Sequence, residues 1–173
     1  DAALQLKKTH TITPENIQKV IIYTDSHGAQ VAIPDPTSFI SVRFSNQYAA
    51  AVALLEGQIS LEQFNEEYAS RPEVKALVAR TEVKIDPEME DNWPHKYASR
   101  IEVLTTDKQR LIAQVDHPKG DIRNPMTSED VLTKARDLLG LIFSENHSEK
   151  IIDAVMQIEN INETKELIGF LRN

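Results

Sequence analysis

The stretch that decides the fold covers residues 41–57 and reads Ser41-Val-Arg-Phe-Ser-Asn-Gln-Tyr-Ala-Ala-Ala-Val-Ala-Leu-Leu-Glu-Gly57. Its larger apolar side chains recur with the period of an α-helix and would form one face, at Phe44, Tyr48, Ala51, Val52 and Leu55. The other side carries alanines, which let neighbouring elements approach closely. Ser45 is a suitable N-cap and Gly57 a suitable residue after the C-terminus. The pattern therefore predicts a buried helix.

Polar side chains gather at or just before the first turn of this predicted helix, at Arg43, Ser45, Gln47 and Tyr48. A helix N-terminus presents unpaired N–H groups and the positive end of the helix dipole, which favour an anion. The cluster could therefore bind a carboxylate. In the alternative interpretation Ser45 only caps the helix and Arg43 only reaches water, and the spacing does not decide between the two.

Composition narrows the class of protein. The 173 residues, 40% hydrophobic and 27% charged, are typical of one soluble globular domain or of a domain with a helical tail. No apolar run approaches the ~20 residues of a membrane span, so we expect no membrane partner and a cytoplasmic location. The net charge of -8 argues against nucleic acid as a partner. The absence of cysteine removes disulfides, thiol nucleophiles and cysteine-held iron–sulfur clusters from this chain.

The first two thirds of the chain predict an α+β fold. Two short helices after Gly57, starting near Ser60 and Ser70, carry the spacing of a capping box. Residues 86–98 read as an acidic surface loop anchored by Trp93. Alternating or β-branched runs predict strands at 18–24, 81–85, 100–105 and 110–115, the last two forming an antiparallel hairpin. We expect a roughly four-stranded, largely antiparallel sheet that is covered by helices.

The last third predicts three helices, the first of them capped by Thr127. We therefore divide the chain into an α+β domain at 1–126 and a C-terminal helical segment at 127–173. These helices carry more apolar surface than is needed to cover one small sheet. We expect them to pack on a domain outside this chain or to form a homo-oligomer interface, such as that of a dimer. The opening at Asp1 resembles a helix already under way, so we interpret the chain as a piece of a longer protein.

A second polar cluster, residues 116–124, follows the last predicted strand and reads Asp116-His-Pro-Lys-Gly-Asp-Ile-Arg-Asn124. His117, Lys119 and Arg123 make it one of the few loops with basic side chains in an acidic chain. Gly120 would let backbone N–H groups approach a carboxylate closely. The alternative is a structural connection between strand and helix whose charges are solvated, and by itself that alternative is the simpler one.

The sequence lacks the usual motifs for a metal or an organic cofactor. The five histidines show no HxH, HxxH or HExxH spacing, and the acidic residues of 86–91 lack the order and the glycine of an EF-hand. There is also no GxGxxG, P-loop or GxSxG motif. We therefore expect no metal and no cofactor.

Two motifs in this order resemble the 2-methylcitrate dehydratase (MmgE/PrpD) family, which includes cis-aconitate decarboxylase. The first is Arg43-Phe-Ser-Asn-Gln-Tyr48-Ala with the following Ala-Leu-Leu-Glu-Gly57, and the second is His117-Pro-Lys-Gly…Asn124-Pro-Met-Thr127 before a capped helix. The order of elements resembles the family across essentially all 173 residues.

The resemblance implies a two-part, cofactor-independent enzyme with an all-helical domain first and the active site between the parts. Most acid–base groups would then lie outside this chain. Of the family's site positions, Tyr48 matches as a catalytic residue, and Arg43, Ser45 and Gln47 match as substrate-binding residues. The loop that holds Gly120 and Asn124 resembles a structural or substrate-closing turn. Many members carry proline at the position of Gln47, and this difference leaves the identity of the substrate unassigned.

We predict from this resemblance the C-terminal part of a hydro-lyase of propionate catabolism, inactive in isolation, that removes water from 2-methylcitrate or a related tricarboxylate. Such a reaction needs a base for the proton α to a carboxylate, an acid for the leaving hydroxyl and donors for the carboxylates. Tyr48 could donate a proton or a hydrogen bond, and Arg43 could bind a carboxylate bidentately. The alternatives are a decarboxylase or epimerase of a related di- or tricarboxylate, and a non-catalytic α+β binding or assembly module.

Overall fold

The computed structural model describes residues 1–171 and divides the chain into two compact units. Unit 1 is Asp1–Asn124 and unit 2 is Pro125–Asn173. The sequence analysis placed the boundary after residue 126.

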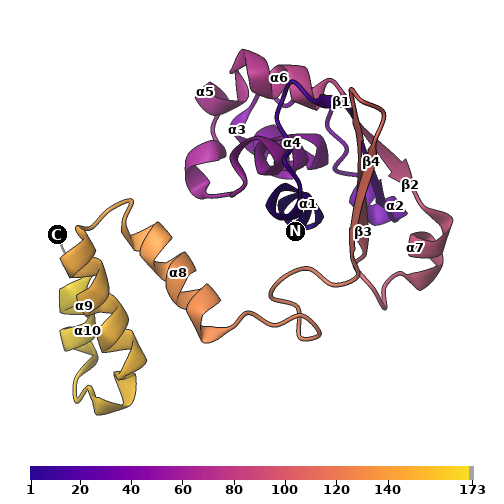
Figure 1. The fold of residues 1–173 in the computed structure, drawn as a ribbon. Coiled ribbons are helices and arrows are strands. Elements are labelled where there is room, and N and C mark those ends of the chain that lie inside the picture. The colour runs from indigo at the N-terminus through magenta and orange to yellow at the C-terminus, as the bar shows by residue number, and fades with distance from the viewer. Residues whose placement is uncertain (172–173) are drawn as a thin grey trace. The chain divides into compact units, whose positions relative to one another are not determined.

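Unit 1 is built on a four-stranded sheet with strand order β2-β1-β3-β4 (Figure 1). The strands are β1 (Ile17–Thr24), β2 (Thr81–Ile85), β3 (Ser99–Thr105) and β4 (Arg110–Val115). Strand β1 pairs in parallel with β2 and antiparallel with β3, and β3 and β4 form the predicted antiparallel hairpin. The α+β prediction is confirmed, with a mixed sheet in which two of the three pairings are antiparallel.

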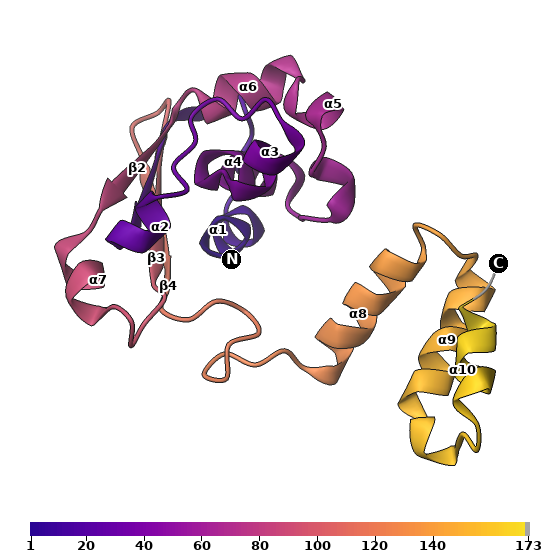
Figure 2. The ribbon, with the colours of Figure 1, turned by 180° about the vertical axis from the view of Figure 1, so that it is seen from behind.

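The longer helices of unit 1 cover one face of the sheet, and the short helix α7 lies at the other face near one end (Figures 1 and 2). Helices α1, α4 and α6 lie on the same side of the sheet in both views (Figures 1 and 2). Tyr48, Val52 and Leu54 of α4 meet Val20 and Val103 of the sheet in one buried core. The elements are α1 (Ala2–Thr9), α2 (Ser26–Ala29), α3 (Phe39–Phe44), α4 (Asn46–Glu56), η1 (Leu61–Gln63), α5 (Glu66–Ala69), α6 (Pro72–Val78) and α7 (Pro87–Asn92), where η marks a 3-10 turn.

The central helix α4 has the predicted ends. The Ser45 hydroxyl accepts a hydrogen bond from the backbone N–H of Tyr48 at 3.1 Å, and Gly57 adopts a left-handed φ of 73°. The prediction was wrong at Phe44, which ends the separate helix α3 and is 57% exposed. Ser45 has an extended conformation, with φ -91° and ψ 114°, and this residue interrupts the helix.

Two further local predictions are corrected. Ser70 ends α5 and does not cap the next helix, because α6 begins at Pro72, which needs no N–H partner at the first helical position. Residues 86–98 contain helix α7, which the Asp86 side chain caps, and are not only a loop. The capping box of Ser60 with Gln63 is confirmed, but it starts a 3-10 turn.

Unit 2 consists of amphipathic helices with little core. The elements are α8 (Ser128–Leu139), α9 (Glu145–Met156), η2 (Ile158–Asn160) and α10 (Thr164–Phe170). Thr127 and Asp130 form the predicted capping box of α8. Among the described residues of this unit, only Ser148, Ile151 and Ile152 are buried. Within residues 1–171 no helix has the length and apolarity required to cross a membrane.

Candidate functional site

Tyr48, the residue with the strongest sequence claim to a catalytic role, is fully buried in unit 1. Its hydroxyl donates a hydrogen bond to the backbone carbonyl of Gln63. The Phe64 ring lies edge-on to the Tyr48 ring, with 5.8 Å between the centroids. Burial raises the pKa of Tyr48 to about 12, while the Arg71 cation acts in the opposite direction. The phenol is therefore a neutral hydrogen-bond donor in this conformation.

Ser45 and Gln47 flank Tyr48 at the start of α4. The Ser45 hydroxyl caps the helix and also donates to the Ile33 carbonyl at 2.6 Å, so its hydrogen-bonding capacity is used within the domain. Gln47 is 4% exposed, and its buried Oε1 has no hydrogen-bond partner. The N–H of Asn46 donates to the Val31 carbonyl at 3.0 Å. Most of the hydrogen-bonding groups at the start of α4 therefore already have partners within unit 1.

Arg43 lies outside α4, in the last turn of α3. Its Nη1 donates to the Phe39 carbonyl at 2.9 Å, and the guanidinium carbon sits 3.4 Å from the centroid of the Phe39 ring. Ser45, Gln47 and Tyr48 lie together at the start of α4, whereas Arg43 lies just before it, on a separate helix. The reason is the break at Ser45 described above.

The loop at 116–124 is closed by its own hydrogen bonds. The Asn124 side chain donates to the His117 carbonyl at 2.8 Å, and the Gly120 N–H donates to the Asn124 carbonyl at 2.8 Å. Gly120 has a φ of 99°, which a residue with a side chain rarely adopts. The Arg123 guanidinium binds Asp121 at 2.9 and 3.0 Å, and this contact lowers the pKa of Asp121 to about 2. The geometry favours the structural interpretation of this loop.

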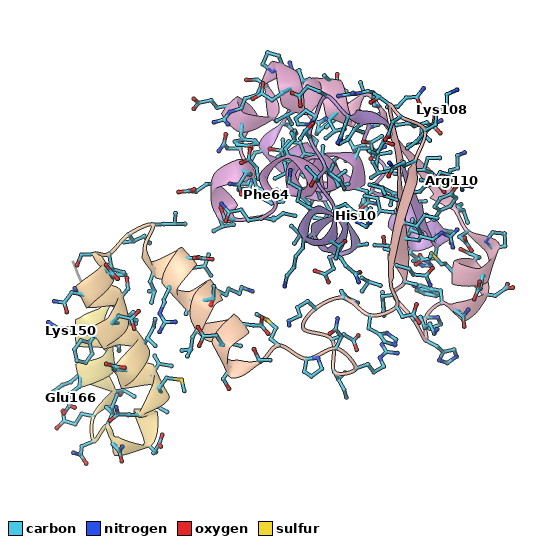
Figure 3. The ribbon with its side chains drawn as sticks, in the orientation of Figure 1. His10, Phe64, Lys108, Arg110, Lys150 and Glu166 are labelled. Atoms are coloured by element: carbon cyan, nitrogen blue, oxygen red, sulfur yellow. The ribbon has the colours of Figure 1, made fainter. Side chains whose placement is uncertain are left out.

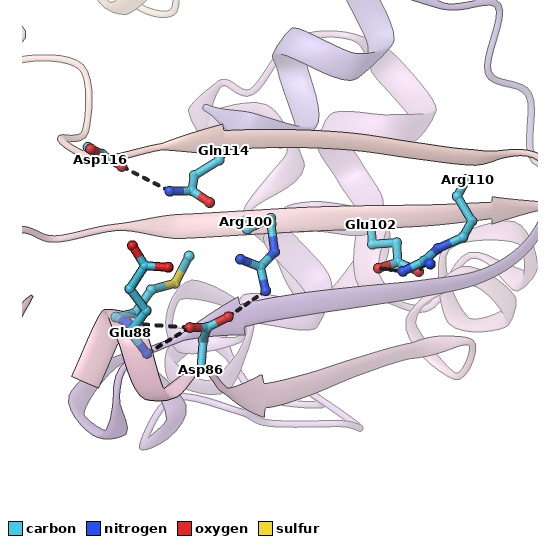
Figure 4. A network of polar contacts seen from close by, with 8 residues as sticks. Asp86, Glu88, Arg100, Glu102, Arg110, Gln114 and Asp116 are labelled. Carbon is cyan, nitrogen blue, oxygen red and sulfur yellow. Dashed lines mark hydrogen bonds and ion pairs between the residues drawn. The ribbon is translucent and has the colours of Figure 1, made fainter. Parts of the chain in front are cut away.

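Sequence reasoning missed a polar network on the face of the sheet away from α4 (Figure 4). Arg110 binds Glu102 bidentately, with both nitrogen–oxygen distances 2.8 Å, and the pKa of Glu102 is lowered by this bond. Arg100 pairs with Asp86 and lies 4.4 Å from the centroid of the Tyr23 ring. Strand register could have shown the Tyr23–Arg100 contact, because the two residues are direct partners in the ladder. Both carboxylates are largely buried, with side-chain exposures of 12% for Asp86 and 11% for Glu102, so each is paired with an arginine inside the fold.

An open cleft of about 180 Å³ lies beside α4. Alanines of α1 and α4, with Ile22, Ile59 and Ile101, supply its apolar walls, and Asp1, Asn46 and Ser99 supply its polar groups. No lysine or arginine is among these lining residues. Any carboxylate bound there would need a cation from elsewhere. The described part of the chain, residues 1–171, holds no group of three or more histidine and acidic side chains that could bind a metal ion.

The sequence was compared with known families and proteins. The family model described as "MmgE/PrpD C-terminal domain" matches residues 1–160. Human cis-aconitate decarboxylase is 28% identical over 178 residues, which cover 99% of this chain and 36% of that protein. The mouse cis-aconitate decarboxylase is 25% identical over 179 residues, with the same coverage. The 2-methylcitrate dehydratase-like protein oryR of Aspergillus oryzae is 32% identical over 118 residues, which cover 64% of this chain and 24% of oryR.

The family match runs through both units and spans the positions of both motifs that carried the resemblance. The chain spans 36% of the length of the mammalian relatives it matches. The chain belongs to the MmgE/PrpD family, in which it corresponds to the C-terminal domain.

Proposed function

We propose that the chain is the C-terminal part of a lyase that acts on a tricarboxylate, with decarboxylation of cis-aconitate as the first candidate reaction. One observation carries the proposal: the mammalian proteins that align with 99% of this chain are named cis-aconitate decarboxylases. Dehydration of 2-methylcitrate, which the sequence analysis ranked first, becomes the second candidate. It is supported by the 32% identity to the dehydratase-like protein of Aspergillus oryzae.

The rest of the active site would come from a helical domain elsewhere in the same polypeptide. The chain spans about a third of the length of its mammalian relatives. A tricarboxylate needs several cationic donors, and the cleft beside α4 is lined by uncharged residues and one aspartate. The exposed apolar side chains of unit 2 would pack on that domain or on a second copy in a dimer.

Tyr48 would act in proton transfer. In the decarboxylation the bond between a carboxylate carbon and the adjacent carbon breaks, CO₂ leaves, and the electron pair that stays on carbon takes up a proton. In the dehydration a base removes the proton α to a carboxylate, and an acid protonates the departing hydroxyl. A neutral phenol can donate the proton in either reaction, with Ser45 and Gln47 placing the helix start and Arg43 contributing a cation at its edge. Gly120 and Asn124 would hold the shape of the closing loop.

The test uses the full-length natural polypeptide that contains this chain. CO₂ release from cis-aconitate and water loss from 2-methylcitrate and citrate are measured for the parent, Tyr48→Phe and Tyr68→Phe. We expect activity on one substrate, a loss of about 100-fold or more in Tyr48→Phe, as is usual for general acid–base groups, and near-parent activity in Tyr68→Phe. The 173-residue chain alone should be inactive.

Thermal melting of each variant separates lost chemistry from lost folding. Full activity in Tyr48→Phe with an unchanged melting temperature would show that Tyr48 has only a structural role. The lyase assignment would not be affected by that result. A parent inactive on all three substrates would contradict that assignment and favour epimerisation of a related carboxylate or a binding role.

A further inference from the structure

Residues 58–64, here called the flap, join α4 to α5 and are held mainly by their own hydrogen bonds. The Ser60 N–H donates to the Gln63 side chain at 2.7 Å, and the Phe64 N–H donates to the Leu61 carbonyl at 3.1 Å. Among the hydrogen bonds found in residues 1–171, the Tyr48 hydroxyl of α4 donates to the Gln63 carbonyl, and the side chain of Asn65, the N-cap of α5, donates to the Glu62 carbonyl at 2.6 Å. Tyr48 is therefore the residue of α4 that holds the flap by a hydrogen bond, and the Phe64 side chain adds a contact with the apolar core.

The inner side of the flap covers Tyr48, and its outer side faces solvent. Gln63 is 6% exposed, and the Phe64 ring lies edge-on to the Tyr48 ring. Figure 3 labels Phe64 in unit 1. On the outer side Leu61 is 54% exposed, whereas Ile59 lines the cleft beside α4. Gln63 and Phe64 of the flap thus contact the Tyr48 side chain directly.

Both ends of the flap are boundaries of helices, where changes in backbone angles are most easily absorbed. Gly57 precedes it with a φ of 73°, a conformation that costs glycine little. Asn65 follows it and starts α5 by accepting a hydrogen bond from the Tyr68 N–H at 2.8 Å. The flap can therefore move while α4 and α5 keep their capping contacts.

We propose that residues 58–64 form a gate which the Tyr48 hydroxyl holds shut, and that Tyr48 reaches a substrate only when this gate opens. The second half of the proposal rests on the proposed function, because it assigns the uncovered phenol to proton transfer. The first half stands on the contacts of the flap alone. One neutral hydrogen bond of ordinary strength shifts an equilibrium by about 5- to 10-fold, so removal of the Tyr48 hydroxyl should favour the open state by that factor.

Opening of the gate also prepares the phenol for chemistry. In the closed state burial keeps the pKa of Tyr48 at about 12, so the hydroxyl retains its proton and holds the Gln63 carbonyl. Access of water removes the desolvation and returns the pKa towards the ordinary tyrosine value of about 10. The same movement that uncovers Tyr48 therefore makes it a better acid.

The gate is tested by pulsed electron paramagnetic resonance on the full chain with two spin labels. The chain has no cysteine, so labels attach only to introduced ones, at Leu61→Cys on the flap and Lys75→Cys on the exposed side of α6. We expect one main distance and a minor longer one, with the minor population raised about 5- to 10-fold in Tyr48→Phe. Tyr68→Phe is the matched control, because it removes a buried hydroxyl that bonds to Glu56 and not to the flap.

An unchanged distance distribution in Tyr48→Phe, or an equal change in Tyr68→Phe, would overturn the gate. If Tyr48→Phe fails to fold, nitration of tyrosines in Phe64→Ala replaces it, since this variant removes the ring contact and keeps the hydroxyl. Faster nitration of Tyr48 with unchanged Tyr68 supports the gate, and an unreactive Tyr48 overturns it. Neither readout depends on activity, so a gate without catalysis would contradict only the proposed function.

Discussion

The two units of this chain bury very different shares of their apolar side chains. Unit 1 closes a continuous core around α4, in which Val42, Val52 and Leu54 are completely buried. In unit 2 the exposed apolar residues outnumber the buried ones, and they include Val131, Ile142, Val155, Met156, Ile158 and Ile168. Both regions show clear helical periodicity in the sequence. The difference teaches that amphipathic periodicity identifies a helix but does not indicate whether the chain supplies the partner for its apolar face.

The largest expected effect comes from cutting the chain between the units. Residues 1–124 should unfold cooperatively on their own, because they contain the whole continuous core. Residues 125–173 alone should show no cooperative transition, since so short a chain with few buried side chains cannot offset its conformational entropy. Calorimetry and circular dichroism of the two pieces check this. A cooperative melt of residues 125–173 would contradict the expected difference in stability between the two units.

The next effect compares one leucine from each unit. Leu54→Ala should lower the free energy of unfolding by about 2–5 kcal/mol, because it leaves a cavity at a fully buried site. Leu138→Ala, at a residue that is 39% exposed, should cost less than about 1 kcal/mol in this chain. Urea titrations of the two variants give the values. Equal losses would mean that unit 2 is better packed than its exposure indicates.

A pair of glycines provides a smaller contrast. In Gly28→Ala the new Cβ would stand 2.2 Å from Thr24 Oγ1, so we expect a loss of about 1–3 kcal/mol. In Gly169→Ala the new Cβ meets nothing within 4 Å, and the better helix propensity of alanine should leave stability unchanged or raise it by up to about 1 kcal/mol. Thermal melts of both variants test the contrast, and a destabilised Gly169→Ala would reveal packing in α10.

The smallest expected effect is the acid response of unit 1. The hydrogen bond from Arg123 holds the pKa of Asp121 at about 2, below its ordinary value of about 3.9. A lowered folded-state pKa adds stability that is complete above about pH 4 and is lost as the pH falls towards 2. Asp121→Asn should therefore flatten part of the decline in unfolding free energy over that interval. Identical pH profiles for the variant and the parent would exclude this contribution.

Much of the fold was predictable because its signals are local. The capping contacts of Ser45 and Thr127 and the left-handed Gly57 depend on a few neighbouring residues, and the structure confirms all three. Each predicted strand lies within one residue of the observed one, since alternation is also a local pattern. Helix α3 was missed, because its capping box joins Ser38 to a serine, not to the glutamate or glutamine that marks the usual pattern.

The site was less predictable because its contacts are non-local. The sequence placed Tyr48 on the right helix, but its partner is a backbone carbonyl in the flap, and a carbonyl has no sequence signature. The same holds for His27, whose ring stacks on the distant Trp93 with 3.8 Å between centroids. The assignments of Tyr48, Arg43, Ser45, Gln47, Gly120 and Asn124 as site residues stay predictions.

The parallel pairing of β1 with β2 has a consequence for the order of folding. The β3–β4 hairpin joins strands through a short turn and can form in about 1–10 μs. Strand β2 is separated from β1 by residues 25–80, which include helices α2–α6, so the chain must close a long loop before the two strands pair. We therefore expect the hairpin and β1 to assemble early and β2 to join last. Substitutions on α4 that weaken its packing would then slow this final step more than any change within the hairpin.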